Sequence, residues 1–126
     1  LGIRGLRASE EDLEAAGARG NRVVTAAAMR RDGIAATLAQ VPAAERIYVT
    51  LDVDVLDPGI AAGTGTPDPG GLSYVETRDL LQGIARKGRI VGFDLLEVNP
   101  WLDQTGVTPL TAAQLTIEFL AAIFDP

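Results

Sequence analysis

Residues 46–71 read RIYVTLDVDVLDPGIAAGTGTPDPGG, and the opening run RIYVTLD indicates a β-strand. An apolar, β-branched run of this kind is typical of a strand that is covered on both faces in a parallel sheet. Asp52, Asp54 and Asp57 interrupt this pattern where the strand ends. An unpaired carboxylate that is removed from water costs free energy. We therefore expect some interaction to compensate these side chains.

The composition limits the class of protein. A chain of 126 residues with 47% hydrophobic residues can form one globular domain, or part of one. The chain has no cysteine, which excludes disulfides and thiolate metal sites, and no histidine, the usual general base near neutral pH. We therefore expect any metal ligands within this chain to be oxygen atoms.

The charge and hydropathy of the chain bear on its partners. The net charge of -6 argues against a nucleic-acid surface and favours cationic small molecules. We find no apolar stretch near the length of about 20 residues that spans a bilayer, and no signal-like opening. We therefore expect a cytoplasmic protein that binds neither nucleic acid nor membrane.

Strand and helix patterns alternate along the chain. Ser9 with Asp12, and Ser73 with Glu76, have the spacing of capping boxes at helix starts. The predicted strands are 1–4, 22–25, 46–52 and 89–96, and the predicted helices are 10–19, 26–40, 74–87 and about 109–124. Such alternation predicts an α/β fold with a parallel sheet and helices on both faces.

The strand ends carry the residues that can do chemistry. In parallel sheets, ligands bind outside the carboxyl ends of the strands. Asp52 and Asp54 lie at the end of the central strand, and Glu97 follows RIVGFDLL at the equivalent place. Because side chains alternate along a strand, the two aspartates are expected on the same side, where they repel unless a cation lies between them. A hard metal ion is the simplest compensation.

Three other interpretations of this segment are possible. An EF-hand needs an oxygen ligand, a glycine and a glutamate at positions that Leu56, Asp57 and Gly63 occupy here, so it is excluded. A P-loop needs a Gly-Lys-Ser/Thr run that does not follow the GTGTP segment. Capping of the turn at Pro58 is the favoured role for Asp57, but that turn does not need both Asp52 and Asp54.

The run LDVDVLDPGIAAGTGTPDPGGLS closely resembles the third signature of the ureohydrolase family, which contains arginases and agmatinases. The resemblance continues through GFDLLEVNP, and GIRG near the start fits an earlier strand. A small departure is Ala62, where the family usually has proline. The resemblance implies an arginase-like three-layer sandwich with a parallel sheet. Residues 1–126 are then expected to be the C-terminal portion of a single domain of this kind.

The resemblance also implies a chemistry. The family is built around two manganese ions that activate a bridging hydroxide, which attacks a guanidinium carbon and releases urea. By resemblance, Asp52 binds both ions, Asp54 binds one of them, Glu97 binds the substrate guanidinium and Thr66 lines the site. The family's other ligands come from a Gly-Gly-Asp-His run and an Asp-Ala-His-x-Asp run, and this chain has neither. We therefore expect the isolated chain to be inactive and assign it no catalytic residue.

Several alternatives stay open at this point. The substrate is agmatine, arginine or another guanidino compound, since substrate choice usually lies in loops that this chain lacks. A non-catalytic truncated relative, acting as a binding or assembly module, is the second hypothesis. The resemblance also implies a homo-oligomer, either a trimer or a hexamer. We expect Tyr48, Trp101, Arg4 and Arg7 to have packing roles rather than binding roles.

Overall fold

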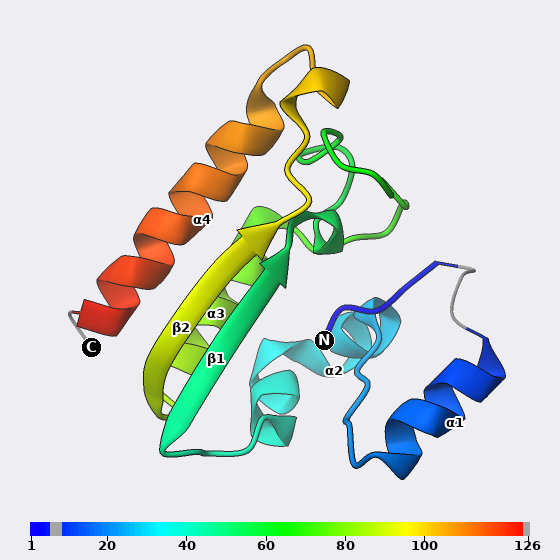
Figure 1. The fold of residues 1–126 in the computed structure, drawn as a ribbon, viewed down its shortest axis with the longest axis vertical. Coiled ribbons are helices and arrows are strands. Elements are labelled where there is room, and N and C mark those ends of the chain that lie inside the picture. The colour runs from blue at the N-terminus through cyan, green and yellow to red at the C-terminus, as the bar shows by residue number, and fades with distance from the viewer. Residues whose placement is uncertain (6–8, 125–126) are drawn as a thin grey trace.

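The computed structural model describes residues 1–5 and 9–124. Within these residues, four α-helices, two β-strands and two 3-10 turns follow one another (Figure 1). Their order is α1 (Glu10–Ala18), α2 (Ala26–Gln40), β1 (Arg46–Asp52), η1 (Val53–Val55), α3 (Tyr74–Ala85), β2 (Arg89–Leu96), η2 (Pro100–Leu102) and α4 (Val107–Phe124). The predicted helices are all present, with ends within two residues of the expected positions.

The two strands form a parallel pair, as predicted. Thr50 lies opposite Asp94 and Asp52 lies opposite Leu96, and one irregularity in the register falls between Ile47 and Tyr48. Both strands therefore end at the same edge of the sheet. Figure 1 shows the loop that follows β1 folded over this edge, beside the segment that follows β2.

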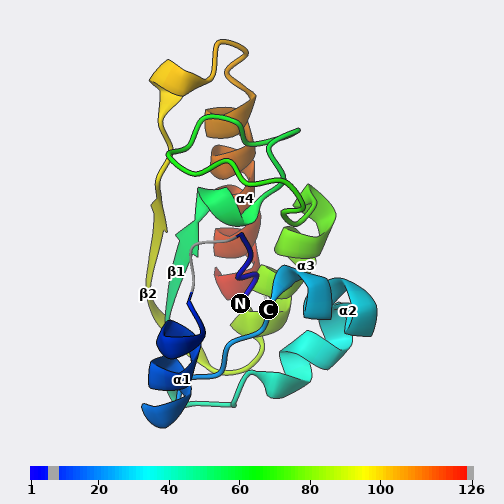
Figure 2. The ribbon, with the colours of Figure 1, turned by 90° about the vertical axis from the view of Figure 1, so that its right-hand side faces the viewer.

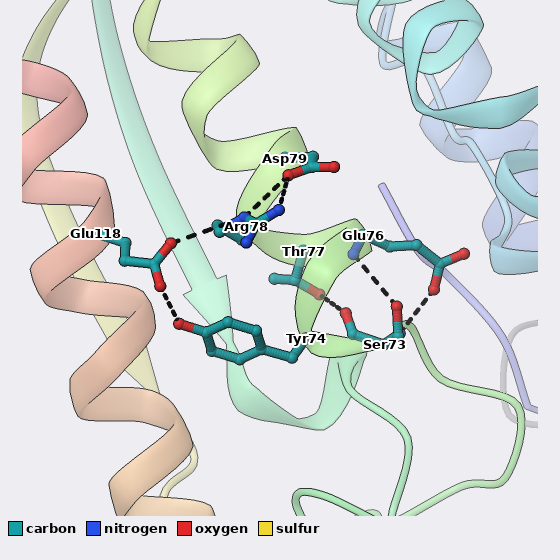
Figure 3. A network of polar contacts seen from close by, with 7 residues as sticks. All are labelled: Ser73, Tyr74, Glu76, Thr77, Arg78, Asp79 and Glu118. Carbon is teal, nitrogen blue, oxygen red and sulfur yellow. Dashed lines mark hydrogen bonds and ion pairs between the residues drawn. The ribbon is translucent and has the colours of Figure 1, made fainter.

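Helix α3 starts at a capping box and is fastened to α4. The Ser73 side chain accepts a hydrogen bond from the backbone of Glu76, whose carboxylate accepts one from the backbone of Ser73. Tyr74 donates to Glu118 of α4 at 2.5 Å, and Arg78 lies 3.7 Å from the same carboxylate (Figure 3). These contacts fix the helix that connects β1 to β2.

The core lies between the sheet and the helices on one side of it. Figure 2 shows α2, α3 and α4 on the same side of the strands. Val49 and Leu51 point into this core, whereas Tyr48 is 62% exposed on the other face. The predicted α/β fold with a parallel sheet is thus confirmed, and within the described residues α2, α3 and α4 cover one face of the sheet rather than both. The reason is that α3 and α4, which follow the two strands, both pack on one face.

The N-terminal part is less regular than predicted. The strands expected at 1–4 and 22–25 are reduced to a single parallel bridge between Ile3 and Thr25. Helix α2 is kinked at Gly33, whose φ of 83° lies in the left-handed region that favours glycine. The helical pattern of the sequence therefore predicted the extent of α2 but missed its kink.

Helix α4 starts at Val107, two residues before the predicted Pro109. Proline is tolerated in a first turn because the backbone N–H that it lacks has no helical partner there. The helix is long and apolar enough to cross a membrane by length and composition alone, so our statement that no such stretch exists was wrong. Leu115 and Phe119 of this helix are fully buried, whereas Leu110, Ile117 and Phe124 are exposed.

Candidate functional site

The aspartate pair lies at the carboxyl end of β1, where the sequence predicted it. Asp52 is the last residue of the strand, and the chain then turns into η1 rather than continuing extended. The backbone N–H of Asp54 donates to Oδ1 of Asp52 at 3.0 Å. The two carboxylates are thus brought together by a 3-10 turn, not by the strand alternation that we expected.

A second contact fixes Asp54. The hydroxyl of Thr66, in the loop that folds back over the strand end, donates to Oδ2 of Asp54. This contact places Thr66 beside the aspartate pair. The sequence had suggested this proximity only through the resemblance, because twelve positions separate the two residues.

Both aspartates line a cavity of about 380 Å³. The cavity lies between β1 and the N-terminal segment. Its walls include Ile3, Arg4, Leu51, Asp52, Asp54 and Thr66. Burial raises the pKa of the Asp52 carboxyl, and the negative charges of Asp54 and Glu97 raise it further, although the hydrogen bond from Asp54 opposes this. The strand end is therefore a place where negative charge gathers and where a cation would be stabilised.

Arg4 has a structural role in this site. Its guanidinium donates to the backbone carbonyl oxygens of Asp54 at 2.5 Å, Leu56 at 3.2 Å and Asp68 at 2.7 Å. The N-terminal segment thereby fastens the aspartate turn to the loop. The packing role predicted for Arg4 is in keeping with these contacts, and Arg7 lies outside the described residues.

Asp57 belongs to the loop rather than to the site. Its carboxylate accepts hydrogen bonds from the backbone of Gly59 and of Gly70, both at 3.0 Å, which lower its pKa. This agrees with the turn-capping role that was favoured for it. At Gly71, a Cβ atom would meet the backbone of Leu56 and Asp57, so only glycine allows this close approach.

Glu97 follows β2 in an unusual backbone conformation. Its φ is 63°, and it is the one positive-φ residue other than glycine in the described part of the chain. Such conformations cost free energy and cluster at functional sites. Oε2 of Glu97 lies 3.2 Å from where a Cβ atom on Gly65 would stand. The sequence placed Glu97 at the strand end, but it gave no sign of this backbone strain or of the role of Gly65.

The segment around Glu97 lines a second, more open cavity of about 430 Å³, together with Gly65, Asn99 and Trp101. Trp101 is 95% exposed and Tyr48 is also largely exposed. Within the described residues neither ring is buried, although the Tyr48 ring lies against Gly92 and its hydroxyl donates to Asp94. Both rings lie on surfaces that the described residues leave open.

The described residues contain a pair of candidate metal ligands but no complete metal centre. In residues 1–5 and 9–124, no group of three or more histidine, cysteine, aspartate or glutamate side chains is placed to hold a metal ion. Asp52 and Asp54 are a pair of hard oxygen donors, the ligand type that manganese and magnesium prefer. Their chemistry fits such an ion, but further ligands are needed to complete its coordination.

Comparison with known proteins agrees with these features. A family model described as "Arginase family" matches residues 1–122. The chain is 40% identical over 123 residues to a proclavaminate amidinohydrolase of Streptomyces clavuligerus, covering 95% of this chain and 39% of that protein. The solved structure of a proclavaminate amidino hydrolase from the same organism superposes with a TM-score of 0.84 at 38% identity, covering 98% of this chain and 42% of that chain.

Two further relatives have guanidino compounds in their names. A guanidinopropionase of Pseudomonas aeruginosa is 40% identical over 128 residues, covering 99% of this chain and 40% of that protein. An agmatinase of Cronobacter sakazakii is 44% identical over 89 residues, covering 71% of this chain and 29% of that protein. The chain thus spans about two fifths of the length of the first two relatives.

Proposed function

This chain belongs to the arginase family, and from that premise we propose that it supplies part of the manganese and substrate site of an enzyme that hydrolyses a guanidino compound to urea and an amine. The observation that carries this proposal is the pairing of Asp52 and Asp54 at the end of β1, within hydrogen-bonding reach of the loop that carries Thr66. The proposed site lies at the carboxyl edge of a parallel sheet, where such folds bind ligands.

Asp52 and Asp54 are the proposed manganese ligands. The two carboxylates are adjacent, and the pKa of Asp52 is raised. A divalent cation stabilises the charged form of both. By family resemblance, Asp52 would hold both ions and Asp54 one of them, and further ligands would have to complete their coordination. When bound, the ions supply Lewis acidity and lower the pKa of coordinated water. The carboxylates of Asp52 and Asp54 have to be held in position to bind an ion. The turn at η1 and the hydrogen bond from Thr66 hold them there.

Glu97 is the proposed substrate-binding residue. A carboxylate suits a guanidinium because both oxygen atoms can accept hydrogen bonds in parallel from the planar cation. Gly65 leaves room for the Glu97 carboxylate at this point of the loop. Because the φ of Glu97 is positive, its side chain leaves the backbone in a direction that a residue in an ordinary strand does not have.

The substrate class is a small guanidino compound. The TPDPGGLS loop resembles that of agmatinases, and the curated relatives include an agmatinase and a guanidinopropionase. We propose an agmatinase-like activity, with arginine as the alternative substrate. We also propose that the complete protein is a cytoplasmic homo-oligomer, a trimer or a hexamer, that binds no nucleic acid or membrane.

The test is urea release by the complete protein that carries this chain. Purified protein loaded with manganese is incubated with agmatine, arginine or 3-guanidinopropionate, and a metal-chelated sample serves as the control. We expect urea from at least one compound, and none after chelation. If manganese is bound but no urea is released from any of them, the second hypothesis, a binding or assembly module, replaces this one.

A further inference from the structure

The cavity that Glu97 lines also contains an aromatic ring that is almost fully open to solvent. Trp101 is 95% exposed, the highest fraction among the exposed large hydrophobic side chains of the described residues. It lines the cavity of about 430 Å³ together with Glu97 and Gly65. A single exposed apolar side chain is common on protein surfaces. The informative feature is therefore the position of Trp101, in one cavity with the proposed substrate-binding carboxylate.

The backbone that carries Trp101 is held in place. The N–H of Asn99 donates to the carbonyl oxygen of Gly63 at 2.7 Å, which joins this segment to the loop that follows β1. The side chain of Asn99 accepts a hydrogen bond from the backbone N–H of Trp101 at 3.2 Å, and it caps η2, which begins at Pro100. The proline ring restricts the backbone further, because it fixes φ. The segment therefore presents Trp101 at a defined place relative to Glu97.

The carboxylate and the indole suit two parts of one ligand. In the proposed function Glu97 accepts hydrogen bonds from the guanidinium, so the rest of the substrate extends from that point. Trp101 lies four residues further along the chain, and four residues span at most about 14 Å. The face of an indole attracts a cation within about 6 Å of the ring centroid. A small guanidino compound bound at Glu97 can therefore contact Trp101 with its far end.

The charge of the described cavity wall favours a cation at that far end. The described residues that line the cavity are Gly65, Glu97, Val98, Asn99, Pro100 and Trp101. Glu97 is the only charged residue among them, so a carboxylate at the far end of the substrate finds no cationic partner on this wall and is repelled by Glu97. An ammonium group is attracted both by Glu97 and by the face of Trp101.

We propose that Trp101 is a specificity-determining residue that contacts the substrate, its indole face lying against the cationic far end of a guanidino compound whose guanidinium Glu97 binds. The inference rests on the proposed function, because it requires the guanidinium to bind at Glu97. It assigns the substrate to the guanidino amines, of which agmatine is one. It disfavours guanidino compounds that end in a carboxylate, such as 3-guanidinopropionate.

The test compares agmatine with pentylguanidine, which has the same length but ends in a methyl group instead of an ammonium group. Urea release by the complete protein with manganese gives kcat and KM for agmatine, and competition in the same assay gives the inhibition constant of pentylguanidine. Trp101→Leu keeps an apolar contact and removes the aromatic face. We expect the KM of agmatine to rise about three- to thirtyfold and the inhibition constant of pentylguanidine to change less than about twofold.

The change should appear in KM with kcat nearly unchanged, because the contact is far from the bond that breaks. Trp101→Phe keeps an aromatic face and should lose less agmatine binding than Trp101→Leu does. Phe124→Leu is the matched control, because it removes an exposed ring at the end of α4, which lies at the other end of the molecule from η2 (Figure 1). Its constants are expected to equal those of the wild type.

Several results would overturn the role of Trp101 alone. In Trp101→Leu, these are an unchanged KM for agmatine or equal losses for agmatine and pentylguanidine. Equal losses together with a changed mass in gel filtration would show instead that the ring packs between copies of the protein. A wild type whose kcat/KM is higher for 3-guanidinopropionate or arginine than for agmatine would also contradict the role. A wild type that binds manganese but releases urea from no guanidino compound would overturn the proposed function as well.

Discussion

A few hydrogen bonds at the end of β1 fix the positions of Asp52 and Asp54. The strand stops at Asp52 because its own carboxylate accepts the N–H of Asp54 and starts a 3-10 turn. Thr66 then binds the second carboxylate from the loop. The local structure therefore orients both side chains before any ion is present, which reduces the ordering that metal binding requires.

We predict that Asp52→Asn loses more manganese than Asp54→Asn in the complete protein, because only Asp52 is proposed to contact both ions. The measurement is the manganese content of each purified variant after gel filtration. Asp57→Asn, in the same loop but held by backbone N–H groups, is the control and should keep its metal. Unchanged content in both site variants would show that the ligand assignment is wrong.

Glu97→Gln tests the substrate contact. The variant removes no proposed ligand, so manganese content should stay constant while about 2–4 kcal/mol of transition-state stabilisation is lost, the scale for one preorganised electrostatic partner. The readout is kcat/KM for urea release at equal manganese occupancy. A change below about threefold would mean that Glu97 does not orient the substrate.

The sequence predicted which residues form the candidate site, but it did not predict their conformations. Asp52, Asp54 and Glu97 were identified because they stand at strand ends in a recognisable signature. The positive φ of Glu97 left no sign in the sequence, because glutamate rarely adopts that conformation. The hydrogen bond from Tyr48 to Asp94 depends on how two strands align, and no local pattern contains that information.

At the scale of elements, the loop between β1 and α3 depends on a close approach of two backbones. Gly71 lies against Leu56, next to the bridge between Leu56 and Leu72. Because a backbone neighbour gives way less easily than a side chain, we predict that Gly71→Ala destabilises the protein by about 1–3 kcal/mol, as overpacking commonly does.

Urea denaturation of the complete protein checks this prediction. The matched control is Gly17→Ala in α1, where a Cβ atom meets nothing within 4 Å. That change should stabilise the protein slightly, because glycine is a poor helix former. Equal midpoints for Gly71→Ala and the wild type would contradict the packing argument.

The start of α4 depends on a buried carboxylate. Asp103 accepts hydrogen bonds from the backbone of Thr105 at 2.9 Å and of Thr108 at 2.6 Å, and from the hydroxyl of Thr105 at 2.5 Å. The hydroxyl of Thr105 and the first turn of α4 hold the pKa of Asp103 well below its usual range. A lowered pKa contributes stability above the unfolded value of about 3.9, and that stability is lost as the pH falls through the folded value.

We therefore predict that, as the pH is lowered, the melting temperature of Asp103→Asn falls less steeply than that of the wild type. Thermal unfolding between about pH 5 and pH 2 checks this, since the unfolded carboxyl titrates in that range. At neutral pH the variant should be less stable than the wild type, because the charged cap is gone. Parallel curves for the two proteins would show that Asp103 does not carry this pH dependence.

Long, strongly patterned elements were predicted well. The apolar runs gave β1 and β2 at their observed positions, and the capping boxes gave the starts of α1 and α3. Prediction was poorer for segments whose secondary structure depends on tertiary contacts. The segments 1–4 and 22–25 have strand-like composition, but they pair with each other only at the bridge of Ile3 with Thr25.

At the scale of the whole molecule, the described chain leaves much apolar surface open. Tyr48, Val91, Leu96, Trp101 and Ile117 are each about half exposed or more. The matched relatives are about two and a half times as long as this chain. These two features are in keeping with our proposal that further polypeptide completes the metal and substrate site.

The most direct test of this account is manganese binding and urea release by two samples, the complete protein and the isolated 126-residue chain. Two carboxylates leave an ion mostly hydrated and freely exchanging, so we predict that the isolated chain retains no manganese after dialysis and releases no urea. The complete protein is predicted to retain two manganese ions and to release urea. Urea release by the isolated chain above a protein-free control, or a complete protein that retains no manganese, would contradict the account.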